Sequence, residues 1–438
     1  MKRRTVNFIM SQNGQKPGIL SVLDRKKLII IGSCVLGALI LGGLYLWYVR
    51  NYANARKVEL ESIKPVSYEW VNGAAEEGIV KEFLWSRTKE LMLKNATDNT
   101  LIVDKITLPG KLIDQTLEES GHYSLSDQAL LLKIYVRDNE RIKAMSLVSE
   151  IDKHFVFENE SVKDKVAYLD AYLEYYSSYG SKSDLQKIEA MTNQLFEEDG
   201  TLKPSLITVA VYHGQAYVSS YDAEAALQTG NATGELESSN NDDGTVDTKT
   251  VEGVLLSSVN LRLIKELEKN GFIPEGAYEK NLKIVKDAVI SSDIPLYSFL
   301  YTLENGEVEY IYSAGSFGTF SIEESVETMR NLAQVGELPE SAYSWIKVTL
   351  YGTEAFYDTY YLASTGLGGN ESFSSYITIA EIAVLYDDRD VFDLCAQRIG
   401  VRIATLDSSP ALSMVFRTEG TRNVVYAKDN LGVYLLIR

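Results

Sequence analysis

Cysteine and histidine are scarce in this chain of 438 residues, which has two of the former and three of the latter. Cys34 lies in an apolar run near the N-terminus and Cys395 lies far along the chain, so no disulfide is expected after that run. The sequence has no zinc-type Cys/His spacing, no phosphate-binding glycine loop and no nucleophilic serine elbow. The sequence therefore implies no metal and no organic cofactor.

Positive charge is also in deficit over most of the chain. Setting aside seven basic residues and Asp24 near the N-terminus leaves 36 basic against 60 acidic residues, a net charge of −24. A surface of this charge repels nucleic acid and anionic lipid headgroups. We therefore expect no nucleic acid among the partners.

One segment, Leu28 to Val49, contains no charged residue over 22 positions. A helix of this length spans about 33 Å, enough to cross a bilayer core of about 30 Å. Tyr45, Trp47 and Tyr48 stand at its C-terminal end, where aromatic rings favour the headgroup layer. The sequence predicts a transmembrane anchor over 28–49. The seven basic residues before it predict a cytoplasmic tail over 1–27 and a C-terminal part on the extracellular side.

A cleaved signal peptide is the alternative for the same segment. Signal peptides have a shorter apolar core, about 7–15 residues, followed by small residues at the cleavage site. Here the core is longer and ends in the bulky run Leu46-Trp47-Tyr48-Val49. These features favour a retained anchor, followed by a stalk over 50–70 and a domain over 71–438.

Apolar residues recur at helical spacing through most of this domain. The helices predicted from this spacing are 82–93, 126–136, 142–155, 162–176, 184–196, 254–268, 278–291, 322–334, 341–352, 374–386 and 391–401. The polar turns 138–140 and 387–390 occupy similar places between successive helices, as expected for repeated helical hairpins. The pattern predicts a toroid of helical hairpins or an α-solenoid.

Three regions depart from the helical pattern. The small, polar and acidic segment 228–250 predicts an exposed, mobile loop. Residues 299–303 and 308–312 flank a glycine turn and predict a β-hairpin. The runs 424–427 and 432–437 near the end of the chain predict two strands.

Three stretches of sequence resemble the six-hairpin glycosidases, glycoside hydrolase family 8 in particular. The stretch Thr116 to Arg141 resembles the hairpin whose Ser-Glu-Gly-Gln-x-Tyr-Gly motif carries the general acid. The next hairpin, Asp164-Lys165-Val166-Ala167-Tyr168-Leu169-Asp170-Ala171-Tyr172-Leu173, resembles the family's Asp-x-Asp-Leu-Trp-x-Ala-x-x-Leu helix. A third stretch, Phe320-Ser321-Ile322-Glu323-Glu324-Ser325, resembles the helix start Phe-x-Tyr-Asp-Ala, whose Asp is the base in many members.

The resemblance implies an (α/α)6 toroid with small β insertions and a pair of catalytic carboxyl groups. Either Glu119 or Asp127 takes the place of the proton donor, and either Glu323 or Glu324 takes the place of the base. Asp164 falls on the carboxylate that contacts the sugar at the cleavage point, and Val166 replaces the second Asp of that motif. Asp127 is one methylene shorter than Glu, so its reach differs by about 1.5 Å, and a shift of about 1 Å can cost roughly a hundredfold in rate. A weakened or inactive relative is therefore one alternative.

Aromatic residues could supply the walls of a sugar-binding groove. The chain has 28 tyrosines, and their rings stack on sugars as readily as they pack in a core. Tyr168 falls on the Trp of the family motif. Tyr357, Asp358 and Tyr360 precede a glycine-rich turn and are the favoured candidates for a groove wall.

The sequence as a whole predicts a membrane-anchored glycosidase-like protein that acts on a cell-surface or exported polysaccharide, with a polysaccharide synthesis or export complex as a possible partner. Two alternatives stay open at this point. One is a non-catalytic saccharide-binding subunit, and the other is a tethered α-solenoid that binds proteins.

Overall fold

The structure is a computed structural model that describes residues 25–53, 57–61, 81–93, 100–108, 118–210, 248–291, 294–304, 307–312, 319–353, 355–361, 367–419 and 422–437. The predicted loop 228–250 lies almost wholly outside these ranges, as does most of the predicted stalk. The N-terminal helix belongs to one unit, and residues 57–180 and 184–438 form another.

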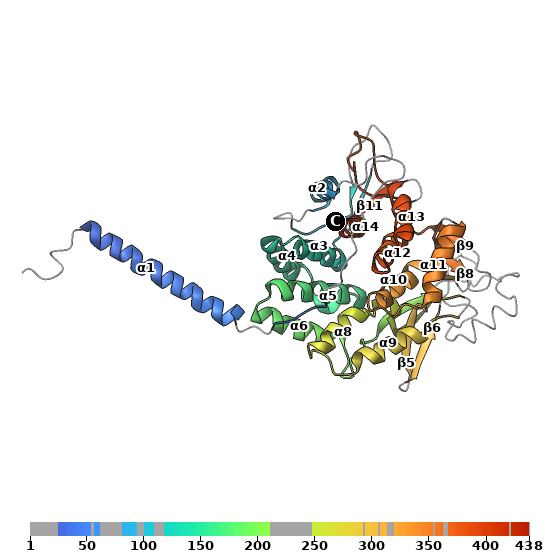
Figure 1. Cartoon of the computed structure of the whole chain (residues 1–438), viewed down its shortest axis with the longest axis horizontal. Coiled ribbons are helices and arrows are strands. Elements are labelled where there is room, and N and C mark those ends of the chain that lie inside the picture. The colour runs from blue at the N-terminus through green and yellow to red at the C-terminus, as the bar shows by residue number, and fades with distance from the viewer. Residues whose placement is uncertain are drawn as a thin grey trace, which may run out of the picture. The chain divides into compact units, whose positions relative to one another are not determined.

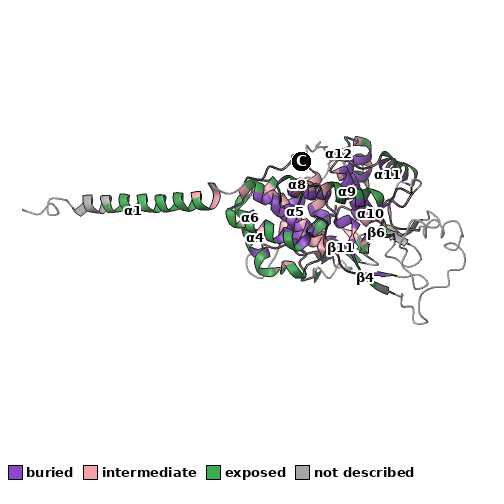
Figure 2. Cartoon of the chain, turned by 90° about the horizontal axis from the view of Figure 1, so that it is seen from below, coloured by how far each residue is buried: buried purple, intermediate pink, exposed green. Residues whose placement is uncertain are grey.

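The N-terminal unit contains the helix α1 (Arg25–Tyr48), which continues into a π-helical turn, η2 (Val49–Ala53). The helical segment Gly32–Tyr52 is long and apolar enough to cross a membrane. Large apolar side chains project from all sides of it, and Leu39 and Leu46 are 68% and 69% exposed. At its end the ring of Tyr48 stacks on that of Tyr52, and the ring of Trp47 meets Tyr52 edge-on at 5.4 Å. In Figure 2 the helix carries exposed residues along its described length.

The second unit is a double ring of helices (Figure 1). Six inner helices pack in a closed circle, in which α14 contacts α3 again and η4 (Leu256–Ser258) bridges α5 and α10. They are α3 (Leu125–Arg137), α5 (Val162–Tyr179), α8 (Leu261–Lys269), α10 (Ile322–Ala333), α12 (Phe373–Leu385) and α14 (Ala427–Leu436). Among the helices that the structure describes, six outer ones each precede one inner helix along the chain. They are α2 (Lys81–Met92), α4 (Arg141–His154), α6 (Lys182–Leu195), α9 (Ala277–Asp287), α11 (Glu340–Thr353) and α13 (Arg389–Gly400).

Several inner helices begin at the same end of the ring. Glu323 at the start of α10 pairs with Lys428 at the start of α14 and accepts a hydrogen bond from Ser374 at the start of α12. The predicted toroid of helical hairpins is confirmed, and a closed ring excludes an open solenoid. One contiguous apolar core fills the space between the two rings, and the buried residues concentrate there in Figure 2.

Two hairpin turns contain a residue in the same backbone conformation. Asn139, between α3 and α4, and Asp387, between α12 and α13, both adopt a left-handed conformation, with φ of 58° and 53°. Asn and Asp tolerate this region better than other non-glycine residues. The Asp388 carboxylate then accepts a hydrogen bond from the Val391 amide and caps α13. The similar placement of these turns, seen in the sequence, reflects a repeated structural unit.

The described residues outside the ring helices include three small antiparallel sheets. The first has the order β10 (Arg417–Glu419), β11 (Arg422–Tyr426), β1 (Lys105–Thr107), β2 (Glu118–Glu119). The second has the order β3 (Ser205–Ala210), β4 (Thr248–Leu255), β5 (Leu300–Glu304), β6 (Glu307–Ile311). The third consists of β7 (Thr319–Ser321), β8 (Tyr357–Tyr361) and β9 (Leu367–Glu371). The predicted β-hairpin is confirmed as β5 and β6, with Leu300 opposite Ile311.

Several local predictions were wrong. Residues 432–436 of the predicted strand 432–437 form the C-terminal half of helix α14, which packs against α3, α12 and α2. Val254 and Leu255 end a strand, and the helix begins only at Leu261. The glycine-rich residues 367–370 belong to strand β9, since they pair with β8.

A buried ionic cluster ties three inner helices together. Asp170 of α5 is 4% exposed and binds Lys133 of α3 and, at 2.5 Å, Arg262 of α8. Arg262 also reaches Glu174 at 3.0 Å. Burial acts to raise the pKa of Asp170, but the two cations outweigh it and the pKa falls below its usual range. The cluster keeps these buried charges paired, as a low-dielectric interior requires.

Candidate active site

Charged side chains gather where the inner helices begin. Asp127 and Asp164 are the third residues of α3 and α5, and Glu323 and Lys428 are the second residues of α10 and α14. A carboxylate in the first turn is favoured by the helix dipole. These first turns come from distant parts of the sequence and converge, since Lys428 pairs with Glu323 and both Lys428 and Asp164 act on Asp127.

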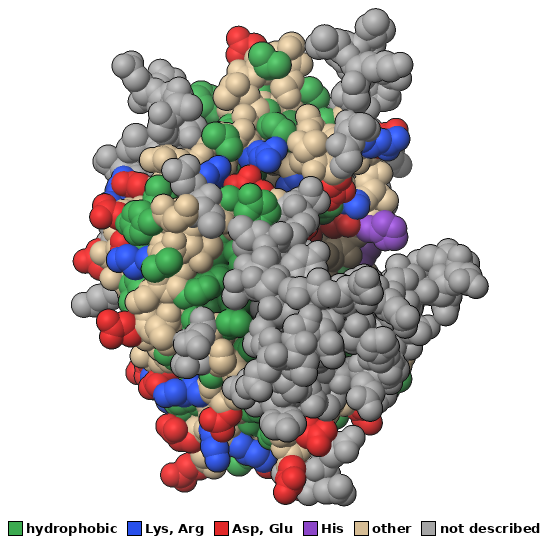
Figure 3. Space-filling model, turned by 90° about the vertical axis from the view of Figure 1, so that its right-hand side faces the viewer, with side chains coloured by type: hydrophobic (Ala, Val, Ile, Leu, Met, Phe, Trp, Pro, Cys, Tyr) green, Lys and Arg blue, Asp and Glu red, His purple; other side chains and the backbone are tan. Residues whose placement is uncertain are grey.

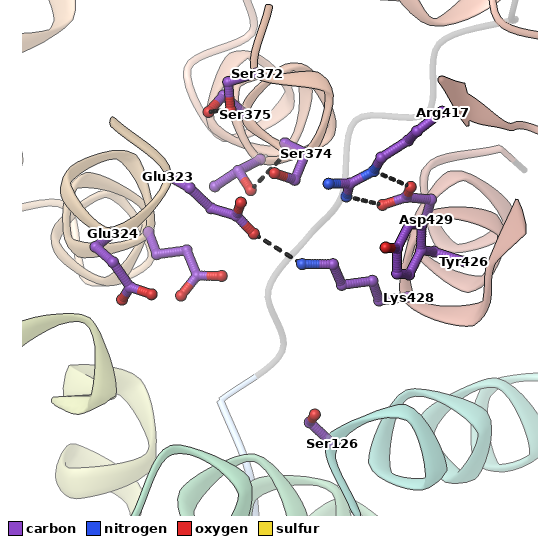
Figure 4. A network of polar contacts seen from close by, with 12 residues as sticks. Ser126, Glu323, Glu324, Ser372, Ser374, Ser375, Arg417, Tyr426, Lys428 and Asp429 are labelled. Atoms are coloured by element: carbon purple, nitrogen blue, oxygen red, sulfur yellow. Dashed lines mark hydrogen bonds and ion pairs between the residues drawn. The ribbon is translucent and has the colours of Figure 1, made fainter. Parts of the chain in front are cut away.

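Glu323 faces Lys428 across this end of the ring (Figure 4). The Lys428 Nζ lies 2.9 Å from the Glu323 Oε1. Burial acts to raise the pKa of Glu323, but Lys428, a hydrogen bond from Ser374 and the nearby Arg417 together lower the pKa to about 2. Glu323 is therefore ionised at neutral pH and available as a base or nucleophile.

Asp429, the neighbour of Lys428, has a cation of its own. Arg417 of β10 donates two hydrogen bonds to the Asp429 carboxylate, each 2.6 Å long. The Arg417 guanidinium also lies 4.9 Å from the Tyr426 ring and 5.7 Å from the Phe373 ring. This bidentate, ring-flanked geometry fixes the orientation of Arg417. Lys428 is thereby left to pair with Glu323.

Asp127 has the opposite electrostatic environment. Its side chain is buried, with 5% exposed. Burial raises the pKa of Asp127 to about 8, Lys428 opposes the rise, and the carboxylates of Asp104, Asp429 and Asp164 add to it. Asp127 is therefore mostly protonated at pH 7 and able to donate a proton. Two carboxyl groups with pKa values moved apart, near one lysine, are the arrangement that acid and base catalysis requires.

Glu324 is engaged in a separate cluster. Both of its oxygens accept hydrogen bonds from Lys163 Nζ, at 2.9 and 3.1 Å, and it also binds Ser257. Lys163 lies 2.6 Å from Glu327 as well, and these two glutamates raise the pKa of the lysine against the effect of burial. Of the two candidate bases, Glu323 is the one that faces Lys428.

Glu119, the other candidate acid, lies on strand β2 and is exposed. It pairs with Ile106 of β1 through the backbone. Sequence position alone could not separate it from Asp127. The difference in burial does, because a raised pKa requires removal of the carboxyl group from water.

Asp164 is held by its own helix start. Ser161 caps α5 by accepting a hydrogen bond from the Asp164 amide at 3.1 Å and donates one to the Asp164 carboxylate at 2.6 Å. The carboxylate still acts on the pKa of Asp127, which places it on the side of the candidate active site.

Tyr168, one turn further along α5, is 2% exposed. Its hydroxyl accepts a hydrogen bond from Lys187 of α6, and it lines a cavity of about 180 Å³ with residues of α4 and α6. It faces the outer helices.

The aromatic candidates further along the chain lie on strand β8. Tyr360 is buried, with its ring 5.7 Å from that of Trp345 on α11. Tyr357 and Asp358 are half-buried on the same strand. The structure thus pairs Glu323 with Lys428, and the charges of Lys428 and Asp164 both act on Asp127. Tyr357, Asp358 and Tyr360 belong instead to the sheet β7–β8–β9. On the face shown in Figure 3, acidic and basic side chains border a hollow.

Lys428 and Arg417 were missed by the sequence analysis. Lys428 stands 105 residues beyond Glu323, and no family motif includes it. The cluster Ala427-Lys428-Asp429-Asn430 before an apolar run was the available signal, because charged residues commonly begin a helix. Within the described ranges no group of three or more His, Cys, Asp or Glu side chains is arranged to hold a metal ion.

No family model and no curated protein matches the chain, but solved structures do. An α-amylase from Clostridium perfringens superposes with a TM-score of 0.58 at 18% identity, over 83% of this chain and 98% of that one. The domain has the fold of the six-hairpin glycosidases. The resemblance read from the motifs is therefore confirmed at the level of fold. PssZ from Listeria monocytogenes matches with a TM-score of 0.49 at 12% identity, over 85% of this chain and 97% of PssZ. A β-1,3-1,4-glucanase from Paenibacillus sp. X4 gives 0.48 at 12% identity, over 81% of this chain and 89% of the glucanase.

Proposed function

We propose that this chain is a membrane-anchored glycoside hydrolase that cleaves a cell-surface or exported polysaccharide. One observation carries the proposal. Burial raises the pKa of Asp127 to about 8, the pKa of Glu323 is lowered to about 2, and Lys428, 2.9 Å from Glu323, acts on both groups. Glycoside hydrolysis needs one carboxyl group in each of these two states.

The roles follow from the protonation states. Asp127 gives its proton to the glycosidic oxygen as the bond between that oxygen and the anomeric carbon breaks. In an inverting reaction Glu323 takes a proton from the water that attacks the anomeric carbon; in a retaining reaction Glu323 attacks that carbon itself. Asp164 is proposed to contact the sugar at the cleavage point, and Tyr357, Asp358 and Tyr360 to lie along the groove.

The charge of the site limits the polymers that fit it. The cations Lys163, Arg417 and Lys428 are all paired with carboxylates. Asp104 and Asp164 lie near Asp127 with serine partners, Ser120 and Ser161. A polysaccharide that carries carboxylate or sulfate groups would meet net repulsion here. The proposed substrate is therefore a polysaccharide without anionic substituents.

A panel of polysaccharides tests this function. We expect the full chain in detergent to release reducing ends from a neutral glycan. A hydroxyethylated glucan should be cleaved about tenfold faster than the matched carboxymethylated glucan at low salt, because a repulsion of about 1.4 kcal/mol corresponds to that ratio. The ratio should fall as salt is raised, since screening weakens repulsion.

Two outcomes would overturn the proposal. Binding of glycans without hydrolysis by the unmodified chain would identify a saccharide-binding subunit instead. If the chain neither binds nor hydrolyses any neutral or charged glycan, a polysaccharide is excluded as its substrate.

Membrane anchoring rests on the N-terminal helix. Its apolar side chains are exposed on all sides, a costly arrangement in water and a favourable one in lipid. The aromatic rings of Trp47, Tyr48 and Tyr52 cluster at its end, as in membrane interfaces. The proposed boundaries are a cytoplasmic tail over 1–27, an anchor over 28–49, a stalk over 50–70 and a catalytic domain over 71–438. The tether confines the domain near the membrane, which suits a polymer that emerges there through a synthesis or export complex.

Cysteine labelling in intact cells tests the orientation. Cys34 lies in the proposed span and Cys395 is fully buried, so the background reactivity is expected to be low. A membrane-impermeant maleimide should label Glu307→Cys, at an exposed position of strand β6, and leave Ser11→Cys unlabelled until the membrane is dissolved. Labelling of Ser11→Cys in intact cells would contradict the orientation, and recovery of the domain in the medium would indicate a cleaved signal peptide.

A further inference from the structure

We propose that Lys428 is a positioning residue whose ammonium group holds the Glu323 carboxylate across the end of the helix ring and couples it to Asp127. The role of Lys428 in catalysis rests on the function proposed above. The coupling itself is a property of the folded chain and can be measured without any substrate.

Helix geometry gives Lys428 and Asp429 separate partners. Successive residues on an α-helix point about 100° apart, so the two side chains leave α14 in different directions. Asp429 meets Arg417 from β10 with two bonds of 2.6 Å, and Lys428 meets Glu323 from α10 at 2.9 Å. Figure 4 shows the two pairs side by side.

The other cations of the site are already paired with other carboxylates. Arg417 is bound to Asp429 and flanked by two aromatic rings. Lys163 is bound to Glu324 and Glu327 on the other side of the α10 helix start. Both cations therefore bind other carboxylates directly, whereas Lys428, with its side chain 44% exposed, binds Glu323.

Charged groups from every neighbouring element bear on the two carboxyl groups. Asp127 is affected by Asp104 before β1, Asp164 of α5, and Lys428 and Asp429 of α14. Glu323 is affected by Lys428 and by Arg417 of β10, and it accepts a hydrogen bond from Ser374 of α12. Lys428 is the one cation among these groups that acts on both carboxyl groups, and it favours ionisation of each.

Removing the charge of Lys428 should therefore move both titrations to higher pH. The Glu323 carboxylate would lose its closest cation, and Asp127 would lose the group that opposes its protonation. The range in which Glu323 is ionised and Asp127 is protonated would shift upward as a whole. For a hydrolase this moves both limbs of the pH profile in the same direction.

Protein stability reports the titration of Asp127 directly. The folded-state pKa of Asp127, about 8, lies above its unfolded value of about 3.9. The equilibrium constant for unfolding of the chain that retains Asp127, divided by that of Asp127→Asn, therefore rises roughly tenfold per pH unit from about pH 4 upward. The rise levels off above the folded-state pKa, because both states are then ionised. The pH at which it levels off measures the pKa in the folded chain.

The experiment follows this levelling point in the full chain in detergent by urea unfolding between pH 5 and 10. In each background, unfolding of the chain that retains Asp127 is compared with unfolding of the chain that carries Asp127→Asn. In the unmodified chain we expect the stability difference to level off near pH 8. Lys428→Met should move this levelling point upward by about one pH unit or more, and Lys428→Arg should leave it unchanged. Lys163→Met is the matched control, since it removes another paired lysine of the site and should leave the levelling point unchanged.

Two results would overturn the proposal. One is an unmoved levelling point in Lys428→Met. The other is an equal shift in Lys163→Met, which would indicate a general effect of net charge. Should Lys428→Met fail to fold, Lys428→Gln provides the same measurement. A shift without hydrolysis of any glycan would retain the coupling and refute the proposed activity, so the two failures are distinguishable.

Discussion

Asp127→Asn is expected to lower the rate of glycan hydrolysis about a thousandfold, within the range of roughly 10² to 10⁴ that general acid catalysis contributes. The amide has nearly the shape of the protonated carboxyl group but cannot give a proton to the leaving oxygen. Because Asp127 is mostly neutral at pH 7, the substitution changes little in the charge of the folded site. The initial rate of reducing-end release by the full chain measures the effect.

Glu323→Gln should produce a loss of similar size, because a neutral amide can neither activate water nor attack the sugar. Glu119→Gln is the matched control. Glu119 is exposed on strand β2, so its replacement should change the rate by less than about twofold, the size of an ordinary surface substitution. A large loss in Glu119→Gln together with an unchanged rate in Asp127→Asn would assign the proton donor to Glu119.

Asp170→Asn is expected to have the largest effect on stability, a loss of about 3–5 kcal/mol in the free energy of unfolding at pH 7. Its carboxylate joins Lys133 and Arg262 inside the ring. Removing its charge leaves two buried cations to share Glu174. Urea unfolding of the full chain measures the loss.

The pH dependence of this loss has a definite sign. The pKa of Asp170 is held below its usual value, so its stabilising contribution is present above about pH 4 and declines as the pH falls further. The difference between Asp170→Asn and the unmodified chain should shrink accordingly in acid. Glu90→Gln is the control, because Glu90 forms an exposed pair with Arg87 on one face of α2, and such pairs contribute about 0–1 kcal/mol. Equal losses in the two variants would show that the cluster does not hold the inner helices together.

Much of the fold could be predicted because helical periodicity is a local signal. The alternation of apolar residues located most of the ring helices, and the similar turns at 138–140 and 387–390 indicated repeated hairpins. Helix α14 was missed because the run Gly432 to Ile437 is rich in residues that favour strands. Its position between α3 and α12 overrides that preference, and such a tertiary contact cannot be read from a single segment.

The sequence supplied candidate residues for the site but not their arrangement, and their roles remain predictions. The motifs indicated Asp127, Asp164 and Glu323 because each stands near the start of a helix. They left Glu119 and Glu324 as equal alternatives, because burial and pairing depend on contacts distant in the sequence. Lys428 belongs to no motif, and its role follows from the closure of the ring, which brings α14 beside α3 and α12.

The central claim is that Asp127 and Glu323 stand on either side of the bond to be cleaved. A crystal structure of Asp127→Asn with a bound neutral oligosaccharide tests it most directly, through the distances from residue 127 to the glycosidic oxygen and from Glu323 to the anomeric carbon. We expect the side chain at 127 to lie within about 3.2 Å of the glycosidic oxygen, with Glu323 or a water bound to it on the opposite face of the sugar. A sugar bound with its glycosidic oxygen beside Glu119, or along β8 and far from both residues, would contradict it.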